Sequence, residues 1–459
     1  MLQSEERERR GARAEEMLED LRQAGVVGVV LPWVDTSGVT RVKSVPLAKL
    51  PSAAAWGVGM SPVFDAFLFD DSIVAGRFAG SAVGDLRLHP DLDRVVRLAA
   101  QPGWAWAPVD RYNQHGVEHP GCQRSFARRL QTQAVDAGLD VRMGFEVEWA
   151  LGLDEGEPFR PACTGPAYGM TRMVELSDYC RDLLTALAAE SVEVFQLHPE
   201  YAAGQLEVSA APLDPVAAAD QVLLVRETIR AVSRAHGMAA SFAPAVVAGS
   251  VGNGQHLHLS LHRDGTNLLA GGSGRYAMTG EGESFLAGLL AELPALCGVG
   301  APSVTSQVRQ VPSHWAGVYR CWGWENREAA LRLVTGSMGE RRSAANVELK
   351  CFDGSANPYL LVGAVLAAGL ASVDKGLTLP PEVTADPAAE DPAELRRLGV
   401  ERLPESPAAA LAALEESDLL REAMGDWLFD AFTAVRRAEI ALFAGHTPEQ
   451  VVAATRWRY

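Results

Sequence analysis

Two glutamates spaced two residues apart give the first sign of chemistry in this sequence. Glu146 and Glu148 lie in the segment GFEVEWAL, where polar and apolar residues alternate as in a strand. Successive side chains of a strand point to opposite faces, so both carboxylates lie on one face, and Phe145, Val147 and Trp149 lie on the other. Two carboxylates on one face can bind cations. The alternative is a half-exposed strand with a charged outer face.

Further carboxylates and two histidines follow in other predicted strands. Glu200 and Glu207 flank a Gly-Gln turn in PEYAAGQLEVS, and Glu348 lies in NVELKCFD. His256 and His258 share one face of the strand in GNGQHLHLSL. An oxygen-rich donor set with one or two histidines suits hard divalent cations such as Mg²⁺ or Mn²⁺ rather than zinc or copper. Taken alone, each residue is also compatible with a purely structural role.

Three arginines lie between the histidine strand and the strand of Glu348. Arg309, Arg327 and Arg332 belong to the segment RQVPSHWAGVYRCWGWENREAALR. A planar guanidinium group matches the geometry of phosphate and carboxylate, so the segment indicates a site for a transferring phosphoryl group. The alternative is a solvated helix face, because the R-x4-R spacing is common on helices.

The frame for these residues is predicted to be an α+β fold. Residues 26–46 have two apolar runs around a Thr-Ser-Gly turn, which predicts a β-hairpin. A Pro-, Gly- and Trp-rich stretch at 84–121 precedes an amphipathic helix that begins near residue 124, and we place a domain boundary there. The elements expected after it are strands at 141–152, 204–210, 256–262, 327–334 and 346–352, and helices at 174–191, 212–237, 282–297, 357–373, 406–418 and 420–443.

Composition narrows the class of protein. The 459 residues exceed what one hydrophobic core usually serves, and 48% hydrophobic with 22% charged residues is ordinary for a globular protein. A net charge of -17 disfavours nucleic acid and anionic membranes as partners and attracts cationic substrates. The six cysteines lack a C-x-x-C spacing, and the N-terminus lacks the apolar run of a secretion signal. The longest apolar segment, 360–373, is shorter than the roughly 20 residues that span a bilayer. We therefore expect a cytoplasmic protein.

Five segments in this order resemble the glutamine synthetase family across roughly residues 20–450: GFEVEW, PEYAAGQLE, GNGQHLHLS, ENR-x4-R and VELKCFDGSANPYL. The hairpin and the segment GDLRLHPD are similar to the N-terminal β-grasp domain of that family. The resemblance implies a β-grasp domain over residues 1–113 and a catalytic domain of curved antiparallel sheet and helices over residues 114–459. It also implies a large homo-oligomer, a dodecamer of two hexameric rings, with active sites between neighbouring subunits.

The resemblance further implies an ATP-dependent ligase that uses two Mg²⁺ or Mn²⁺ ions in each active site. Glutamate's γ-carboxylate would attack the γ-phosphate of ATP, and an amine would then displace phosphate from the γ-glutamyl phosphate. The implied ligands are Glu148, Glu200 and Glu207 for one ion, and Glu146, His256 and Glu348 for the other. The implied ATP contacts are His258, Ser260, Arg327 and Arg332, and the implied glutamate contacts are Gly252 and Arg309. Arg309 and Arg327 are the residues to which we give a catalytic role.

The acceptor site departs from the family pattern at Trp315. Ammonia-using members carry a glutamate there that binds and deprotonates ammonium. An indole instead offers an apolar wall and a π face for an organic cation, worth about 0.5–2 kcal/mol. Tyr168 matches a tyrosine that lines the same site. We therefore predict a ligase for a polyamine, ethanolamine or another organic amine; the alternatives are an ammonia-using glutamine synthetase and a catalytically silent member with a structural or regulatory role.

Other departures concern the acid and the nucleotide. Lys350 replaces an arginine that clamps glutamate's carboxylate, so a point charge takes the place of a bidentate fork. Asn346 replaces an arginine near the nucleotide, and Ala245 replaces a lysine. All six implied metal ligands are present, which favours an active enzyme. The family's N-terminal aspartate, which reaches the acceptor site across a subunit interface, matches Asp65 or Asp70.

Overall fold

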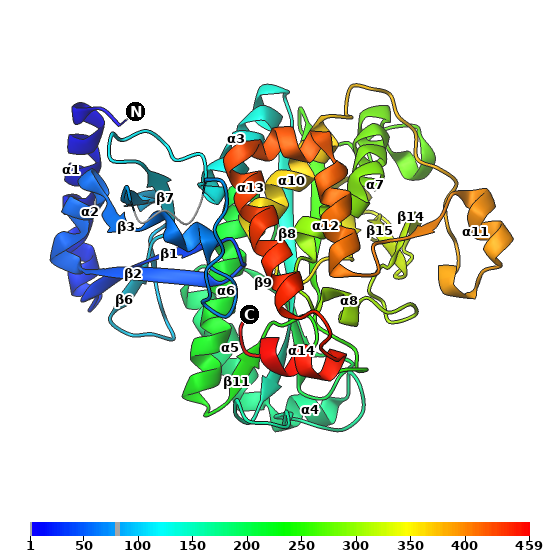
Figure 1. The fold of residues 1–459 in the computed structure, drawn as a ribbon, viewed down its shortest axis with the longest axis horizontal. Helices are drawn as coiled ribbons and strands as arrows, with labels where there is room; N and C mark the ends of the chain where they lie inside the picture. Colours follow the sequence, from blue (N-terminus) through cyan, green and yellow to red (C-terminus); the bar gives the residue numbers. More distant parts are fainter. Residues whose placement is uncertain (1, 79–82) are drawn as a thin grey trace.

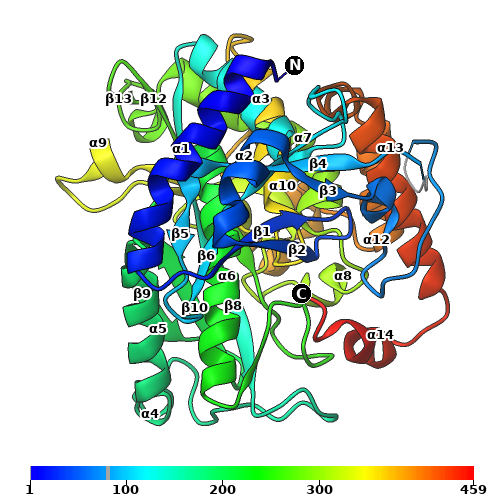
Figure 2. The same cartoon turned by 90° about the vertical axis from the view of Figure 1, so that its left-hand side faces the viewer.

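The computed structural model describes residues 2–78 and 83–459, and it has a smaller N-terminal part beside a larger body (Figure 1). In the N-terminal part, α1 (Ser4–Gln23) lies along the outer side and packs on α2 (Leu50–Trp56), as Figure 2 shows. Leu18 and Leu21 of α1 share a buried cluster with Val29 and Leu31. The strands are β1 (Gly28–Val34), β2 (Thr40–Pro46), β5 (Val96–Arg97) and β6 (Trp104–Trp106) in one sheet of order β2-β1-β6-β5, and β3 (Val58–Met60), β4 (Leu86–Pro90) and β7 (Val109–Tyr112) in a second.

The predicted hairpin at residues 26–46 is confirmed by the antiparallel pairing of β1 and β2, which runs from Gly28 with Pro46 to Val34 with Thr40. Its tip reaches the larger body. Gly38 has a φ of 93°, and a Cβ there would lie 2.2 Å from the carbonyl oxygen of Ser355, so only glycine allows this close approach. The β-grasp arrangement and the boundary after residue 113 stay predictions.

A ten-stranded sheet forms the centre of the larger body. Its main path has the order β17-β14-β15-β16-β12-β8-β10-β9, with β11 on β8 and β13 on β12. The five predicted strands are confirmed within a few residues as β8 (Asp140–Gly152), β10 (Gln205–Ala210), β12 (Gln255–Arg263), β15 (Ala329–Val334) and β16 (Asn346–Leu349). The others are β9 (Val194–Pro199), β11 (Ala239–Ser241), β13 (Thr266–Asn267), β14 (Tyr319–Trp324) and β17 (Glu401–Arg402).

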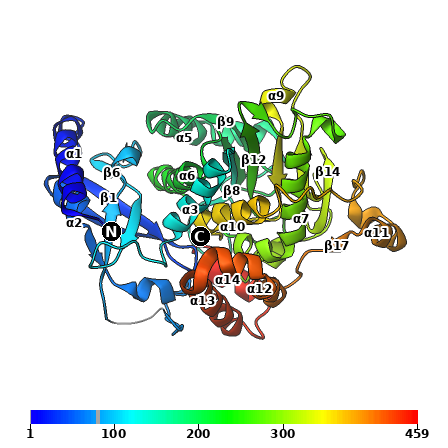
Figure 3. The same cartoon turned by 90° about the horizontal axis from the view of Figure 1, so that it is seen from above.

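Helices cover one face of this sheet (Figure 3). Met143, Phe145, Val147 and Trp149 of β8 point into a core that these helices share, because alternate residues of a strand face the same side. Glu146 and Glu148 consequently face the opposite side. The covering helices are α3 (Gln123–Asp136), α5 (Ser177–Ala189), α6 (Pro215–Ala235), α7 (Gly280–Gly300), α10 (Pro358–Leu370), α12 (Pro407–Glu416) and α13 (Asp418–Leu442).

The predicted helices are confirmed with two corrections. The segment 420–443 corresponds to α13, but the helix is broken at Gly425, which has non-helical angles of φ 74° and ψ 163°. The segment 174–191 is two helices, α4 (Met170–Glu175) and α5, because Leu176 has non-helical angles of φ -103° and ψ 16°. Ser406 caps α12 as expected, since its side chain accepts a hydrogen bond from the Ala409 amide. The remaining short helices are α8 (Ser306–Arg309), α9 (Arg341–Ala344), α11 (Pro392–Leu398) and α14 (Pro448–Thr455).

Among the described residues, α7 is the one helix long and apolar enough to cross a membrane by length and composition. The sequence predicts 360–373 as the longest apolar segment, but α7 is longer. About 72% of its most apolar stretch is buried inside the protein, where α7 packs against α10 and α12. This is the environment of a core helix in a globular protein.

Arg124 of α3 joins the N-terminal part to the larger body. Its buried guanidinium donates to Asp220 of α6 at 2.8 and 2.9 Å, to Asp110 at 3.1 Å and to Asp91 at 2.7 Å. Asp91 and Asp110 belong to the N-terminal part, so one side chain neutralises carboxylates from both sides of the junction.

We expect Arg124→Leu to lower the free energy of unfolding by about 3–5 kcal/mol, because it leaves the buried carboxylate of Asp220 without a cation, whereas Asp110 keeps its ion pair with Arg128. Urea denaturation followed by circular dichroism measures the change. Arg181→Leu is the matched control, since Arg181 forms exposed ion pairs on α5 and should change stability by no more than about 0.5 kcal/mol. Equal losses in the two variants would contradict the assigned role of Arg124.

Candidate active site

A cavity of about 600 Å³ lies over the face of the large sheet that carries Glu146 and Glu148. Strands, the 309–316 segment and the loop after β9 all contribute to its wall. Of the residues predicted for the site, the cavity is lined by Glu146, Glu148, Tyr168, Glu200, Glu207, Gly252, His256, His258, Arg309, Trp315, Arg327, Arg332 and Lys350. Glu348 is buried directly behind this wall, and Ser260 lies elsewhere.

Strand pairing places the acidic and histidine side chains opposite one another. In the register of the sheet, Glu146 is paired with His256, and His258 is paired with Glu348. Glu148 is paired with Glu207 on the other edge of β8. Residues directly opposite on antiparallel strands have Cβ atoms about 4.5–5.5 Å apart, so the backbone alone brings these charges together.

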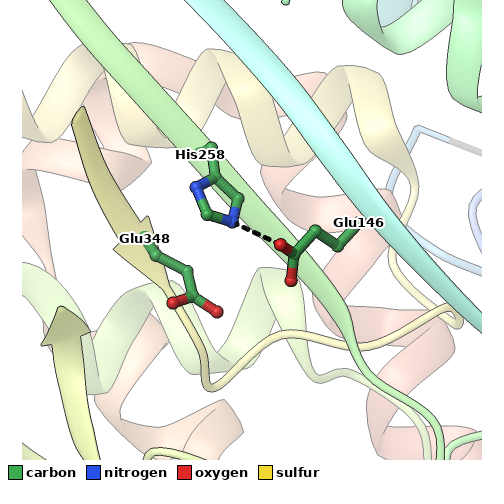
Figure 4. A group of neighbouring side chains, drawn as sticks. All are labelled: Glu146, His258 and Glu348. Carbon is green, nitrogen blue, oxygen red and sulfur yellow. Dashed lines mark ion pairs between the residues drawn. The ribbon is translucent and has the colours of Figure 1, made fainter. Parts of the chain in front are cut away.

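Glu146, His258 and Glu348 form the first compact group, with one from each of β8, β12 and β16 (Figure 4). One ligand atom from each lies within 4.8 Å of the others, and His258 Nε2 is 3.2 Å from Glu146 Oε1. His256 is also close, since its Nδ1 lies 3.1 Å from both Glu146 and Glu348. The three residues predicted to share an ion, Glu146, His256 and Glu348, are therefore neighbours, with His258 equally near.

The electrostatics of this group favour charged side chains. Burial alone would raise the pKa of Glu146, but hydrogen bonds with His256 and His258 hold it well below its usual range. Burial opposes protonation of His258, yet the hydrogen bond and charge of Glu146 raise the pKa of His258 to about 9. The carboxylates thus keep the imidazoles protonated. A bound metal ion could replace these protons as the positive charge that neutralises the carboxylates.

A second compact group contains His198, Glu200 and Glu207, whose ligand atoms again lie within 4.8 Å of one another. Burial, together with the charge of Glu148, raises the pKa of Glu200 to about 7. The hydrogen bond to Glu207 raises the pKa of His198 to about 9. Glu148 lines the same cavity, and its Oε2 accepts hydrogen bonds from Gln205 at 2.9 Å and from the Gly254 amide at 2.8 Å.

His198 was missed in the sequence. Its position in β9 could have revealed it, because it lies two residues before Glu200 and is paired with Glu207 in the sheet register. The segment QLHPE carries the same every-second-residue spacing that marked Glu146 and Glu148. A proline between His198 and Glu200 hides the strand pattern in the sequence.

Basic side chains line the cavity directly beside the first group. Arg309 is buried, and its Nη2 lies 3.2 Å from both His256 Nε2 and the Lys350 carbonyl oxygen. Gly252 packs against it: a Cβ there would lie 2.0 Å from the Pro244 carbonyl oxygen and 3.0 Å from Arg309 Cγ. Lys350 donates from Nζ to Glu348 at 2.9 Å. In this structure, Lys350 therefore neutralises a carboxylate of the protein.

The other two predicted arginines, Arg327 and Arg332, differ in their contacts with the protein. Arg332 of β15 donates to Glu348 at 3.0 Å and to Glu325 at 2.7 Å, which fixes its guanidinium at the cavity wall. Arg327 lines the cavity from an exposed position just before β15. The alternative of a solvated helix face is wrong for both, because Arg332 lies in a strand and Arg327 in the turn that precedes it.

Ser260 lines a neighbouring cavity of about 640 Å³, which shares Glu146 and His258 with the first. Asn346 also lines this second cavity, and its Oδ1 lies 2.8 Å from His258 Nδ1. His258 thus stands between the two cavities. Ala245 is fully buried in the core of the larger body.

Aromatic rings line the cavity near the second carboxylate group. The rings of Trp315 and Tyr201 have centroids 5.2 Å apart, and those of Tyr168 and His198 are 6.2 Å apart. Trp315 is 41% exposed and Tyr201 46% exposed. Tyr201 was missed in the sequence, although it directly follows Glu200. We name Trp315 and Tyr201 the aromatic pair.

The two aspartates considered for the acceptor site lie in the N-terminal part. Asp65 is buried and pairs with Arg111 at 2.5 Å within the same chain. Asp70 is half-buried, and it accepts hydrogen bonds from the amide and hydroxyl of Ser72. A contact of either with a neighbouring subunit stays a prediction.

The chain is similar to known proteins along almost its whole length. Residues 120–453 match the family model of the glutamine synthetase catalytic domain. The chain is 56% identical over 450 residues to the γ-glutamylpolyamine synthetase GlnA3 of Streptomyces coelicolor, covering 97% of each chain. It is 28% identical to the glutamine synthetase of Clostridium saccharobutylicum, over 93% of this chain and 94% of that protein. A solved structure described as a novel glutamine synthase homolog superposes with a TM-score of 0.84 at 33% identity, covering 95% of this chain and 99% of the other. The chain belongs to the glutamine synthetase family.

Proposed function

We propose that this protein is an ATP-dependent ligase that joins the γ-carboxylate of glutamate to an organic amine, with polyamines as the favoured acceptors. The observation that carries the proposal is the 56% identity, over 97% of both chains, to a γ-glutamylpolyamine synthetase. The 28% identity to an ordinary glutamine synthetase is half as large, so ammonia use is the less supported alternative.

The cavity supplies a physical reason for this preference. Where the family resemblance expects a carboxylate for ammonium, the wall presents the indole of Trp315 beside Tyr201. Aromatic faces attract organic cations and also pack against their methylene groups. The net charge of -17 of the whole chain also attracts cationic substrates.

The proposed reaction has two steps. The γ-carboxylate oxygen of glutamate attacks the γ-phosphorus of ATP, ADP leaves, and a γ-glutamyl phosphate remains. The amine nitrogen then attacks the activated carbonyl carbon, the bond to phosphate breaks, and the amine loses a proton. Arg309 and Arg327, which line the cavity, would hold the acid and the phosphoryl group, because guanidinium forks match both. Lys350 and Gly252 would contact glutamate, while His258, Ser260 and Arg332 would contact ATP.

We also propose that the acidic side chains bind two divalent cations, Mg²⁺ or Mn²⁺. The donors fit such ions, because they are carboxylate oxygens with few imidazoles, gathered in two groups on one sheet face. Burial, and then the negative charge of Glu148, raise the pKa of Glu200, and a bound cation would offset both effects. Glu148, Glu200 and Glu207 would hold one ion, and Glu146, His256 and Glu348 the other, with His198 and His258 adjacent. Bound cations would neutralise the phosphate oxygens during transfer.

The assembly and compartment are proposed on the same basis. We propose a cytoplasmic homo-oligomer, a dodecamer of two hexameric rings, with ATP, glutamate and the amine as its small-molecule partners. Within the described residues, β9 is an edge strand of the large sheet, and its residues Gln196 and His198 line the cavity. No further strand in the part of the chain that the structure describes covers β9, so a neighbouring subunit could approach the site from this edge.

We expect phosphate release from ATP in the presence of glutamate and Mg²⁺ to depend on putrescine or spermine, and to be much slower with ammonium or ethanolamine. Mass spectrometry of the products should identify a γ-glutamyl amide. Turnover with ammonium and with no organic amine would show that the protein is an ammonia-using glutamine synthetase. Failure with every amine, together with no binding of Mg-ATP, would favour a catalytically silent member.

We expect Trp315→Glu to raise the KM for polyamines by about 2- to 30-fold and to increase turnover with ammonium, because it removes a cation–π wall and adds a carboxylate. Trp324→Glu is the matched control, since Trp324 is comparably exposed but stacks on Tyr276 outside this cavity. If Trp315→Glu left the amine preference unchanged, Trp315 would not be part of the acceptor site.

We expect Mn²⁺ to raise the unfolding temperature of the metal-free protein, and Glu207→Gln to weaken Mn²⁺ binding by at least about tenfold, or about 1.4 kcal/mol. Thermal unfolding across a Mn²⁺ titration measures this without any need for activity. Glu193→Gln serves as control, since Glu193 is exposed just before β9. Equal Mn²⁺ responses in both variants would argue against a metal at Glu207.

A further inference from the structure

The aromatic pair depends on an unusual backbone segment. Trp315 lies in the connection between α8 and β14, which we call the tryptophan loop (residues 310–318). Ser313 and Trp315 both have a φ of 57°, in the left-handed region. Bulky side chains are rare there, because the Cβ approaches the following carbonyl oxygen. Such a conformation persists only where the surroundings hold it in place.

Glu328 holds this backbone in place. Its Oε1 accepts a hydrogen bond of 2.8 Å from the amide of Trp315, and the side chain is almost fully buried at 8% exposure. Glu328 does not line the cavity, so it acts on the site through Trp315.

The turn that carries Glu328 is itself anchored. The amide of Glu328 donates to Asn326 Oδ1 at 3.0 Å. Asn326 Nδ2 in turn donates to the carbonyl oxygens of Val383 at 2.8 Å and Ala385 at 2.9 Å. The carboxylate is therefore presented from a rigid support just before β15, and the tryptophan loop takes its position from that support.

The opposite member of the aromatic pair is held as firmly. The buried Arg172 donates to the carbonyl oxygens of Glu200 at 2.6 Å and Ala202 at 2.7 Å, on either side of Tyr201. Tyr201 is thus fixed from its own side of the cavity. The position of Trp315 relative to it depends on the tryptophan loop, and hence on Glu328.

We propose that Glu328 is a positioning residue that sets amine selectivity by holding Trp315 against Tyr201. This inference rests on the proposed function, in that the amine must enter beside Trp315. The carboxylate takes no part in proton transfer. Its role is to satisfy the Trp315 amide in a backbone conformation that leaves the indole facing Tyr201, so that the width of the acceptor site is fixed before the amine binds.

The test compares Glu328→Leu with Glu328→Gln in the full-length protein. The leucine removes the acceptor for the Trp315 amide, whereas the glutamine amide oxygen can replace it. We expect the leucine variant to raise the KM for spermine by about tenfold while the KM values for ATP and glutamate change by less than about twofold. The glutamine variant should stay near the wild type.

Hydrogen–deuterium exchange supplies a readout that needs no activity. The peptide containing Trp315 should exchange faster in Glu328→Leu than in the wild type, and Glu328→Gln should restore protection. Glu190→Leu is the matched control: Glu190 is also buried, but it accepts hydrogen bonds from the Ala99 amide and the Thr228 hydroxyl far along the chain. It should leave both the spermine KM and the exchange at Trp315 unchanged.

A selective rise in the spermine KM with faster exchange at Trp315 supports the inference. Unchanged exchange would overturn the positioning role, and faster exchange with an unchanged spermine KM would overturn the link to selectivity. An equal rise in Glu190→Leu, or a uniform rise in all three KM values, would also overturn it, because general loss of stability would explain the result. A wild-type protein that turns over no polyamine would instead contradict the proposed function, while exchange would still decide whether Glu328 holds Trp315.

Discussion

The whole site depends on the pairing of β8 with β10 and β12. This pairing fixes Glu146 opposite His256, which attract each other, and Glu148 opposite Glu207, two carboxylates that repel each other and are held together by the backbone hydrogen bonds of the sheet. The free energy for this comes from the other face of the same strand, where Phe145, Val147 and Trp149 are buried among helices. A one-residue slip of β8 would exchange the two faces, and would remove both the core and the site.

Strands and loops carry different functional groups of the cavity. The carboxylates and histidines of the proposed metal groups lie on or directly beside strands of the large sheet. The aromatic pair lies on two loops, each held by a buried charged side chain, Glu328 on one side and Arg172 on the other. Strands suit groups whose spacing must be constant, because many hydrogen bonds fix each position. Loops suit groups that determine which substrate enters.

Much of this could be predicted from the sequence, because period-two alternation identifies strands and places side chains on faces. That rule located β8, β10, β12 and β16, and it placed the glutamates of β8 and the histidines of β12 on shared faces, while the full set of six metal ligands was implied by the family resemblance. It could not reveal the break at Leu176, where neither glycine nor proline marks the helix end, nor the N-terminal α1, whose charged residues give a weak apolar stripe. His198 escaped notice because Pro199 hides the strand pattern, and Tyr201 did so because its ring partner, Trp315, is distant in sequence. The role of Glu328 required coordinates, since a hydrogen bond to a left-handed backbone leaves no residue pattern.

The location of Trp315 on a loop has a consequence for how this family can diversify. The tryptophan loop connects α8 to β14 without pairing into the sheet, so an exposed residue such as Trp315 can change with little cost to the strands beneath. Acceptor choice and phosphoryl chemistry can then be altered by separate mutations. A lineage could acquire a new amine as nutrient by remodelling a few residues of one connection, while the inherited catalytic sheet continued to fold as before.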